Sequence, residues 1–430
     1  FNGGLFEHVL VEPLSAGEIK ALAGIGLLEW DEVEPAIFGT LFERSLDPSR
    51  RSQLGAHYTG VQDIERVIDP VVMQPLLRRW DAVRAEADPL AQTWTAARKD
   101  GTPQKRNAAE KAFRGVIADF LTELRHIPVL DPACGSGNFL YVALCKLMDL
   151  EREVIEYAAA QGMTRMFPEV SPRQVLGLEI NEYAVEITRT VVWIGFLQWR
   201  VMHGFGVGDP VLQPLDTIRE QDALLDLSDP DYPKEAVWPA ADFIVSNPPF
   251  LGAKKMRSEL GDVYVDDLHR TFSGRFPPFA DLVVYFFEKA RSQIEQGQSQ
   301  RAGLIATNSI RGGSNRPVLD RIKETGDIFM AWHDEPWVLD GAAVRIAIIA
   351  FDDGSELTRM LDGTPVPAIT SALSTGVDLS LPRPLSENRG VCFLGVQLSG
   401  PFDISSNQAL HFLELPLNPN GAPNMSWDLA

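Results

Sequence analysis

Residues 131–137 read Asp131-Pro132-Ala133-Cys134-Gly135-Ser136-Gly137. They follow a short apolar run with the length of a buried strand, Pro128–Leu130, and precede a helix-like run that begins at Asn138. In an open α/β sheet, ligands bind at the carboxyl ends of the strands. A Gly-x-Gly turn there lets a ligand approach the backbone, and the following helix offers free N–H groups. We therefore expect this turn to hold a small cofactor; an ordinary tight turn is the alternative.

Strand-like and helix-like runs alternate around that turn, from Ile127 to about Phe351. The helix candidates are Asn138–Leu150, Glu182–Phe196 and Asp281–Ile294, and the strand candidates are Pro128–Leu130, Val175–Glu179, Phe243–Val245, Gly303–Ala306, Ile328–Trp332 and Arg345–Phe351. Such alternation predicts a parallel or mostly parallel sheet with helices on both faces. We therefore expect a doubly wound α/β fold.

Acidic residues stand at or just beyond the ends of several strand-like runs. Asp131 follows the first run, Glu179 ends the second, and Asp222 lies in Gln221-Asp222-Ala223-Leu224. An acid repels phosphate, so this set favours a cofactor that carries an ammonium and a sulfonium. A carboxylate at Glu179 can accept both hydroxyls of a ribose, and one at Asp222 can accept an exocyclic amine. The alternatives are a helix cap for Glu179 and an acid without a ligand for Asp222.

A second motif, Asn247-Pro248-Pro249-Phe250, follows the apolar run 242–245. The Asn247 side-chain oxygen and the Pro248 carbonyl can accept hydrogen bonds from a planar amino group, because proline fixes φ and has no N–H donor. The Phe250 ring offers a face on which an unstacked base can lie. A simple turn is the alternative for this motif alone, since Asn-Pro and Pro-Pro are turn dipeptides. The presence of both motifs, each after a strand, argues against that alternative.

A third segment, Gly55-Ala56-His57-Tyr58-Thr59-Gly60, precedes a helical run from Ile64. The ring and hydroxyl donors of His57, Tyr58 and Thr59 are suited to close over one end of the cofactor. Farther along, Asp281-Leu282-Val283-Val284-Tyr285-Phe286 is typical of a helix whose first residues line a pocket, and a plain amphipathic core helix is its alternative.

The order of these motifs resembles that of the γ class of DNA adenine-N6 methyltransferases. The strings Phe38–Glu43, Leu54–Thr59 and Asp131–Leu140 are similar to the methyltransferase portion of large single-chain restriction–modification enzymes of the MmeI-like kind, and to related phage-exclusion methyltransferases. The likeness spans residues 30 to 355. In that pattern Tyr-Thr usually continues with Pro, Ser or Thr, whereas this chain has Gly60, which leaves the start of the following helix open.

The resemblance implies a class I S-adenosylmethionine-dependent methyltransferase fold, with a mostly parallel, seven-stranded type of sheet and an N-terminal helical extension. It implies methyl transfer from S-adenosylmethionine to the N6 amine of an adenine flipped out of double-stranded DNA, within a restriction–modification or antiviral defence system. The seven histidines show no metal-ligand spacing, so we expect no metal. The catalytic residues carried over are Asn247, Pro248, Pro249 and Phe250. The cofactor-binding residues carried over are His57, Tyr58, Thr59, Asp131, Pro132, Ala133, Gly135, Gly137, Asn138, Phe139, Glu179, Ile180, Asp222, Ala223, Asn247 and Asp281.

Other substrates and roles fit parts of the same pattern. An Asn-Pro-Pro-aromatic motif also serves methyltransferases that act on protein glutamine side chains or on RNA bases, although these usually carry Tyr in the fourth place. A further alternative is a non-catalytic specificity or scaffold subunit that retains the fold. The presence of both motifs in intact form argues against it.

The net charge of −20 is unusual for a protein that grips DNA, because phosphate contacts need Lys and Arg. Local basic groups are present nonetheless: Arg44, Arg50, Arg51, Lys254, Lys255, Arg257, Arg270, Arg275, Arg311 and Arg316. The chain has three cysteines, no signal-peptide pattern and no apolar run of membrane-spanning length. We therefore expect a cytoplasmic protein that does not bind or span a membrane.

Shifts of composition divide the chain into four parts. Residues 1–50 are a helical lead-in, 51–126 a helical segment with the Tyr-Thr motif, 127–355 the catalytic domain, and 356–430 a linker toward a target-recognition region. Within the second part, Lys99-Asp100-Gly101-Thr102-Pro103 predicts the turn of a helical hairpin, for which a surface insertion is the simplest account. Because the chain starts at Phe1 without a methionine, we expect it to be a piece of a longer protein, with partner domains or subunits outside it.

Overall fold

The computed structural model describes residues 13–27, 35, 37, 60–164, 166–206, 214–229, 232–339, 342–376 and 405–414. Residues 1–378 make up one compact unit, and residues 379–430 a second. In the second unit the described element is helix α13, Ser406–Glu414. The Tyr-Thr segment, with His57, Tyr58 and Thr59, lies outside the described residues.

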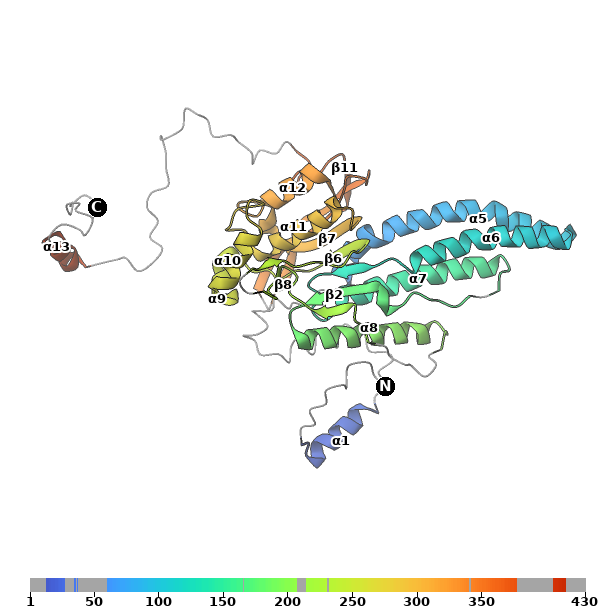
Figure 1. Cartoon of the computed structure of the whole chain (residues 1–430), viewed down its shortest axis with the longest axis horizontal. Coiled ribbons are helices and arrows are strands. Elements are labelled where there is room, and N and C mark those ends of the chain that lie inside the picture. The colour runs from blue at the N-terminus through green and yellow to red at the C-terminus, as the bar shows by residue number, and fades with distance from the viewer. Residues whose placement is uncertain are drawn as a thin grey trace. The chain divides into compact units, whose positions relative to one another are not determined.

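A nine-stranded sheet runs through the described part of the first unit, in the order β11-β10-β8-β9-β7-β6-β1-β2-β3 (Figure 1). Strands β3, β2, β1, β6 and β7 are parallel neighbours, while β9 is antiparallel to both β7 and β8. The strands are β1 Val129–Asp131, β2 Val175–Glu179, β3 Ile218–Glu220, β6 Phe243–Ser246, β7 Arg301–Thr307, β8 Asp327–Leu339, β9 Ala342–Asp352, β10 Arg359–Leu361 and β11 Thr364–Val366. The strand order doubles back at β1, where β2 lies on one side and β6 on the other, and ligands bind at such a switch point.

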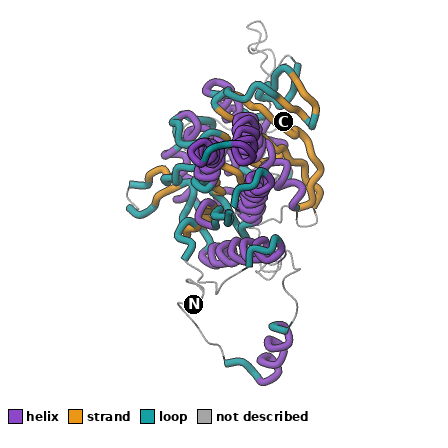
Figure 2. Tube along the Cα trace, turned by 90° about the vertical axis from the view of Figure 1, so that its right-hand side faces the viewer, coloured by secondary structure: helices purple, strands orange, loops and turns teal. Residues whose placement is uncertain are grey.

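Helices cover both faces of this sheet, as the turned view shows (Figure 2). Helix α4, the π-turn η1 and helix α7 pack on one face, and α11 and α12 pack on the other. The described helices of the first unit are α1 Ala16–Ile25, α4 Val61–Ile68, η1 Asp69–Met73, α5 Gln74–Asp100, α6 Pro103–Leu124, α7 Asn138–Ala160, η2 Pro172–Gln174, α8 Glu182–Met202, α9 Ala253–Leu260, α10 Asp262–Thr271, α11 Leu282–Glu295, η3 Asn308–Arg311 and α12 Pro317–Thr325. A short ribbon, β4 Leu225–Asp226 with β5 Lys234–Glu235, stands apart from the main sheet.

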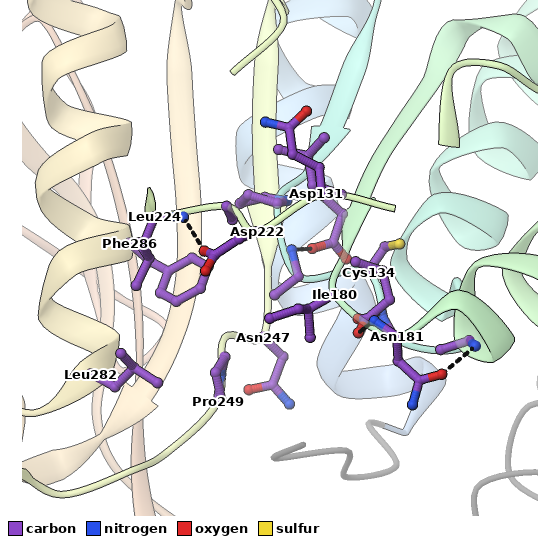
Figure 3. A pocket seen from close by; sticks show the side chains of 18 of the residues that line it. Asp131, Cys134, Ile180, Asn181, Asp222, Leu224, Asn247, Pro249, Leu282 and Phe286 are labelled. Carbon is purple, nitrogen blue, oxygen red and sulfur yellow. Dashed lines mark hydrogen bonds between the residues drawn. The ribbon is translucent and has the colours of Figure 1, made fainter. Parts of the chain in front are cut away.

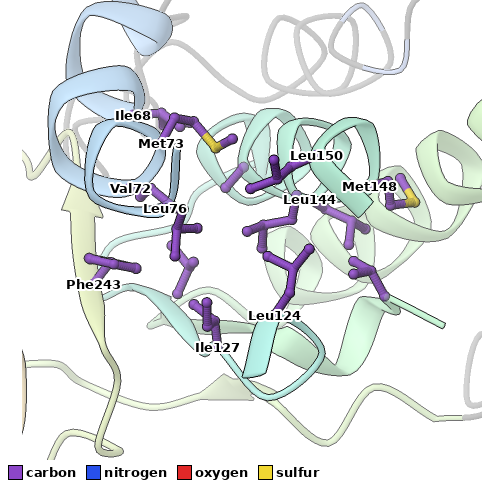
Figure 4. Close-up of a cluster of buried hydrophobic side chains, with 14 of the residues drawn as sticks. Ile68, Val72, Met73, Leu76, Leu124, Ile127, Leu144, Met148, Leu150 and Phe243 are labelled. Carbon is purple, nitrogen blue, oxygen red and sulfur yellow. The ribbon is translucent and has the colours of Figure 1, made fainter. Parts of the chain in front are cut away.

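The two faces of the sheet are buried in separate hydrophobic clusters because neighbouring strand residues point to opposite sides. Phe243 and Val245 of β6 belong to the cluster under α7 and η1, and Ile244 belongs to the other. Figure 4 shows Phe243 of β6 and Val72 of η1 among the side chains of that first cluster. Gly303 of β7 permits the close approach of η1, since a Cβ there would lie 2.6 Å from Val71 Cγ2.

The expected helical hairpin is present as α5 and α6, joined at Gly101 and Thr102. It is packed rather than loosely inserted: the Trp80 ring stacks on Phe120 with 5.4 Å between centroids, and Trp94 stacks on Phe113 at 5.6 Å. The Trp80 indole N–H donates to Glu153 of α7 at 3.0 Å. These contacts make the hairpin a rigid extension of the layer formed by α7.

The expected doubly wound, mostly parallel fold is confirmed, with the helix and strand candidates present and longer at several ends. Several short strands escaped prediction; among them β3 has three residues, Ile218–Glu220, and two of them are exposed and charged. Strand β8 continues past the expected run Ile328–Trp332 to Leu339, and its register with β9 shifts between Trp332 and Glu335. The sheet also continues beyond residue 355 into β10 and β11.

No helix among the described residues is long and apolar enough to cross a lipid bilayer.

Candidate active site

The turn after β1 is built around Asp131. Its Oδ1 accepts hydrogen bonds from the Ala133 N–H at 3.0 Å and from the Ser246 hydroxyl of β6 at 2.6 Å. Burial raises the pKa of Asp131 to about 7, although the hydrogen bond from Ser246 opposes that rise. Gly135 and Gly137 have φ of 51° and 85°, which L residues rarely adopt, so the turn into α7 requires glycine at these positions.

Glu179 ends β2 and ties the neighbouring turns together. Its Oε2 accepts from the Gly135 N–H at 3.0 Å, and its Oε1 accepts from the Asn181 N–H at 3.0 Å. Burial raises the pKa of the Glu179 carboxyl, and the backbone hydrogen bonds oppose this rise. Asn181, rather than Glu179, caps α8 through its side chain, so the carboxylate lone pairs left over stay available to a ligand.

Asp222 follows β3 and is held by its own turn and by a tyrosine. Its Oδ1 accepts from the N–H groups of Leu224 and Leu225 at 2.7 and 3.2 Å, and its Oδ2 accepts from the Tyr264 hydroxyl of α10 at 2.8 Å. Burial and the charge of Asp222 both raise the pKa of Tyr264, so this hydroxyl remains a donor. The carboxylate is therefore fixed in orientation at the carboxyl end of β3.

These acids and the second motif line one cavity of about 430 Å³, a size within the usual range of ligand pockets. In Figure 3, Asp222, Leu282 and Phe286 lie on one side, Cys134 and Asn181 on the other, and the Asn247 amide between them. The predicted site residues that line the cavity are Asp131, Pro132, Ala133, Gly135, Asn138, Phe139, Glu179, Ile180, Asp222, Ala223, Asn247, Pro249 and Phe250. The cavity thus brings both motifs and all three strand-end acids together.

Three predicted residues are described but do not line that cavity: Gly137, Pro248 and Asp281. Gly137 caps α7 in the left-handed conformation, and Pro248 lies between two lining residues. The carboxylate of Asp281 accepts from the Ala253 N–H at 3.0 Å, the Ser309 hydroxyl at 3.1 Å and the Asn315 amide at 2.6 Å. Asp281 therefore joins the segment after Phe250 to the turns after β7.

Several lining residues escaped prediction, chiefly Tyr264, Asn181 and Glu259, whereas Leu282 and Phe286 belong to the run expected to line a pocket without being named as site residues. Leu282 and Phe286 lie in the run that sequence singled out as a helix, and their i, i+4 spacing puts both on one face of α11. Nothing in the local sequence of Tyr264 marks it, because its partner Asp222 lies 42 residues earlier.

Most basic residues near this cavity are already paired with acids. Arg257 contacts Asp262 at 3.1 Å and Asp266 at 2.7 Å. Arg270 contacts Asp267 at 3.2 Å, and Arg275 contacts Glu235 at 2.5 Å. In the described part of the chain, Lys254 and Lys255 of α9 are exposed and form no ion pair, whereas Arg44, Arg50 and Arg51 lie outside it. The local basic set is therefore weaker than its sequence suggests.

Comparison with known proteins identifies the family and confirms the fold. Residues 104–362 match the family described as "MmeI, DNA-methyltransferase domain". The chain belongs to this family. The match extends over more than half of the 430 residues and includes both motifs and all three strand-end acids.

Two relatives of this MmeI methyltransferase family member illustrate the likeness. DNA methyltransferase A of Bacillus subtilis (strain 168) is 27% identical over 366 residues, which are 81% of this chain and 38% of that protein. The type IIL restriction–modification enzyme MmeI, solved in complex with DNA, aligns with a TM-score of 0.66 and 26% identity over 88% of this chain and 49% of its own. The class I methyltransferase fold expected from sequence is thus confirmed. The chain spans less than half the length of each of these relatives.

Proposed function

We propose that this chain transfers a methyl group from S-adenosylmethionine to the N6 amine of an adenine in DNA. The observation that carries the proposal is the single cavity in which Asp131, Glu179 and Asp222 meet the Asn247–Phe250 loop. Three acids at adjacent strand ends suit a ligand with cationic and hydrogen-bond-donating groups, and the loop presents acceptors beside an aromatic ring. Cofactor and target amine therefore have separate places within one cavity.

The residues present fit the proposed cofactor. Asp131 lies where a carboxylate attracts the ammonium of the methionine portion, Glu179 where it accepts ribose hydroxyls, and Asp222 where it accepts the adenine amine. Asn138 supports the fit, because its Oδ1 is buried in the cavity wall and has no hydrogen-bond partner among the described residues. A buried acceptor of this kind is costly unless a donor reaches it. His57, Tyr58 and Thr59 are proposed to close over the same ligand.

The substrate side is assigned to Asn247, Pro248 and Phe250. An exocyclic adenine amine is a poor nucleophile, because its lone pair is delocalised into the ring. The Asn247 side-chain oxygen and the Pro248 carbonyl accept from its two N–H groups and turn the nitrogen lone pair toward the methyl group. The Phe250 face holds the flipped base. The cofactor supplies an electrophilic methyl group; a nitrogen–carbon bond forms, the carbon–sulfur bond breaks, and the amine proton passes to solvent.

The longer relatives suggest the setting. MmeI is described as a type IIL restriction–modification enzyme, and this chain corresponds to about half of it. We place the chain as the methyltransferase part of a restriction–modification or antiviral defence system, with DNA recognition shared with regions outside the 430 residues.

The test is to incubate the protein with methyl-labelled S-adenosylmethionine and, in parallel, with DNA, RNA or protein substrates. N6-methyladenine in digested DNA, identified by mass spectrometry, is the expected product. Label in N4-methylcytosine would keep the mechanism and change the base. Label in protein glutamine or RNA would replace the substrate, and cofactor binding without any transfer would support a non-catalytic role.

A further inference from the structure

The tip of the helical hairpin carries a local excess of positive charge in an acidic chain. Residues 98–114 include six cations and two acids, although the net charge of the protein is −20. The six are Arg98 and Lys99 at the end of α5, and Lys105, Arg106, Lys111 and Arg114 on α6. We call these six residues the basic tip.

The basic tip is exposed and is not neutralised within the protein. All six side chains are exposed, and none forms an ion pair with an acid in the described part of the chain. Lower on the same hairpin the cations are paired, since Arg79 contacts Glu123 at 3.3 Å and Arg84 contacts Asp81 at 3.0 Å. Charge is thus segregated along the hairpin, with paired charges below and unpaired cations at its end.

Two of these cations stand where a helix disfavours them. Lys105 and Arg106 lie in the first two turns of α6, after the cap Thr102, and the first turn holds no acid. The N-terminal end of a helix carries partial positive charge, so cations there reduce helix stability. Arg106 Nε donates to the Gly101 carbonyl at 3.2 Å, but no acid in the described residues pairs with either cation. Cations kept at a helix start without an acidic partner break a local rule, and such breaks are a mark of a functional surface.

The basic tip is also rigid and remote from the cavity. Stacking of Trp94 on Phe113 lies just below it, and the Arg98 guanidinium lies 5.1 Å from the Trp94 ring centroid. Arg98 also donates to the carbonyl of Gln161, which caps the C-terminal end of α7, whereas Asn138 at the other end of α7 lines the cavity. With 23 residues in α7, these ends are roughly 33 Å apart at about 1.5 Å per residue.

We propose that the basic tip binds the sugar–phosphate backbone of duplex DNA, at a place separate from the base that the cavity captures. Unpaired cations on a rigid support neutralise phosphates at little entropic cost, and DNA offers a regular array of them. The choice of DNA over another polyanion rests on the proposed function. An acidic face of a second copy of this chain is the competing occupant, and the experiment separates the two.

The decisive variant is Lys105→Glu/Arg106→Glu. Glutamate in the first turns of α6 interacts favourably with the helix dipole, so we expect the melting temperature to be unchanged or higher. We expect the cofactor affinity not to fall. The matched control is Arg219→Glu/Lys234→Glu, which makes the same change of net charge at two other exposed cations. The probe is a fluorescent duplex made only of G·C pairs, which offers no adenine to the cavity.

We expect the tip variant to bind this duplex at least tenfold more weakly than the control at low salt. Its plot of log affinity against log salt should lose a slope of about 0.9 for each phosphate contact removed, or about 1.8 for two. Equal affinities and slopes for tip variant and control would overturn the proposal. Self-association without DNA that sedimentation detects, and that the tip variant loses, would also overturn the proposal. The basic tip would then bind a second copy of the chain and not DNA.

The two proposals fail separately. Suppose that the protein binds the G·C duplex through the tip but methylates no substrate in the separate transfer assay. The tip proposal then stands and the proposed function is refuted. If the tip variant binds the G·C duplex like the control and still methylates adenine at saturating DNA, the reverse holds.

Discussion

Asn247 is the residue on which the proposed chemistry depends most. Asn247→Ala removes the proposed acceptor of the target amine while the three acids of the proposed cofactor site remain. We expect methyl transfer to be abolished and cofactor affinity to change little. Phe250→Ala should instead weaken base capture by about 1–3 kcal/mol, and Phe250→Trp should keep part of the activity. Calorimetry and product analysis on the three variants check this, and normal turnover by Asn247→Ala would refute the mechanism.

Asp131 predicts a pH dependence of cofactor affinity. Its pKa of about 7 lies above the usual value for Asp, so the folded protein holds this proton more tightly than the unfolded chain. That contribution to stability is complete below the unfolded pKa and is lost as the pH rises through about 7. A cationic cofactor binds the ionised carboxylate, so affinity should rise toward pH 8 and fall up to about tenfold per unit below pH 7.

The measurement is calorimetry with S-adenosylhomocysteine across that pH range, in two buffers that differ in ionisation enthalpy. Wild type should release a proton on binding below pH 7. Asp131→Asn should bind more weakly and without that proton, and an unchanged pH profile in this variant would exclude Asp131 as the source.

Tyr264 contacts Asp222, so under the proposed function it is a positioning residue for that carboxylate. Tyr264→Phe removes the hydroxyl that holds Asp222 Oδ2 at 2.8 Å and leaves the ring in place. We expect cofactor affinity to fall by about 1 kcal/mol, or roughly fivefold. The preference for S-adenosylhomocysteine over S-inosylhomocysteine, which lacks the exocyclic amine, should shrink as well. Equal losses for the two ligands would show that Tyr264 contributes only packing.

At the scale of elements, Asp281 joins three segments ahead of α11. Its carboxylate accepts from Ala253, Ser309 and Asn315, and its own N–H donates to Asn315 at 2.8 Å. Because Ala253 follows Phe250 closely, this junction sets the path of the loop that we propose holds the target base. Asp281→Ala should therefore raise the KM for DNA and lower turnover.

The same variant separates two interpretations of Asp281. If Asp281 orders the loop, as its contacts indicate, cofactor affinity should change by no more than about twofold. The reason is that the substitution should change the interaction energy of the three strand-end acids by only about a few tenths of a kcal/mol. If it contacts the cofactor, as the sequence pattern predicts, calorimetry should show a large loss of affinity.

At the scale of the whole molecule, charge governs the encounter with DNA. The net charge is −20, and Arg257, Arg270 and Arg275 are committed to acids on the protein itself. We expect the 430 residues alone to bind DNA weakly, with affinity falling steeply between about 50 and 200 mM salt. Anisotropy titrations check this. Tight, site-specific and salt-insensitive binding would show that recognition needs nothing outside the chain.

The strand–turn–helix unit at residues 131–138, the alternating runs and the acids at Glu179 and Asp222 could all be predicted from the sequence. The reason is that each depends on residues close together in the sequence. The period of a strand, a glycine turn and the start of a helix are each determined by a few neighbouring residues. Parallel strands then bring their carboxyl ends to one edge, so acids far apart in the chain meet there. The family resemblance added the order of the motifs and is confirmed by the match over residues 104–362.

Only the tertiary structure decided which side chains hold those acids. Ser246 reaches Asp131 across 115 residues, and Tyr264 reaches Asp222 across 42. It also drew Asp281 into a junction of loops and paired most of the basic residues near the cavity with acids. Such pairings depend on how whole elements pack and on which neighbouring group donates a hydrogen bond to each buried carboxylate. Sequence periodicity carries no information about either.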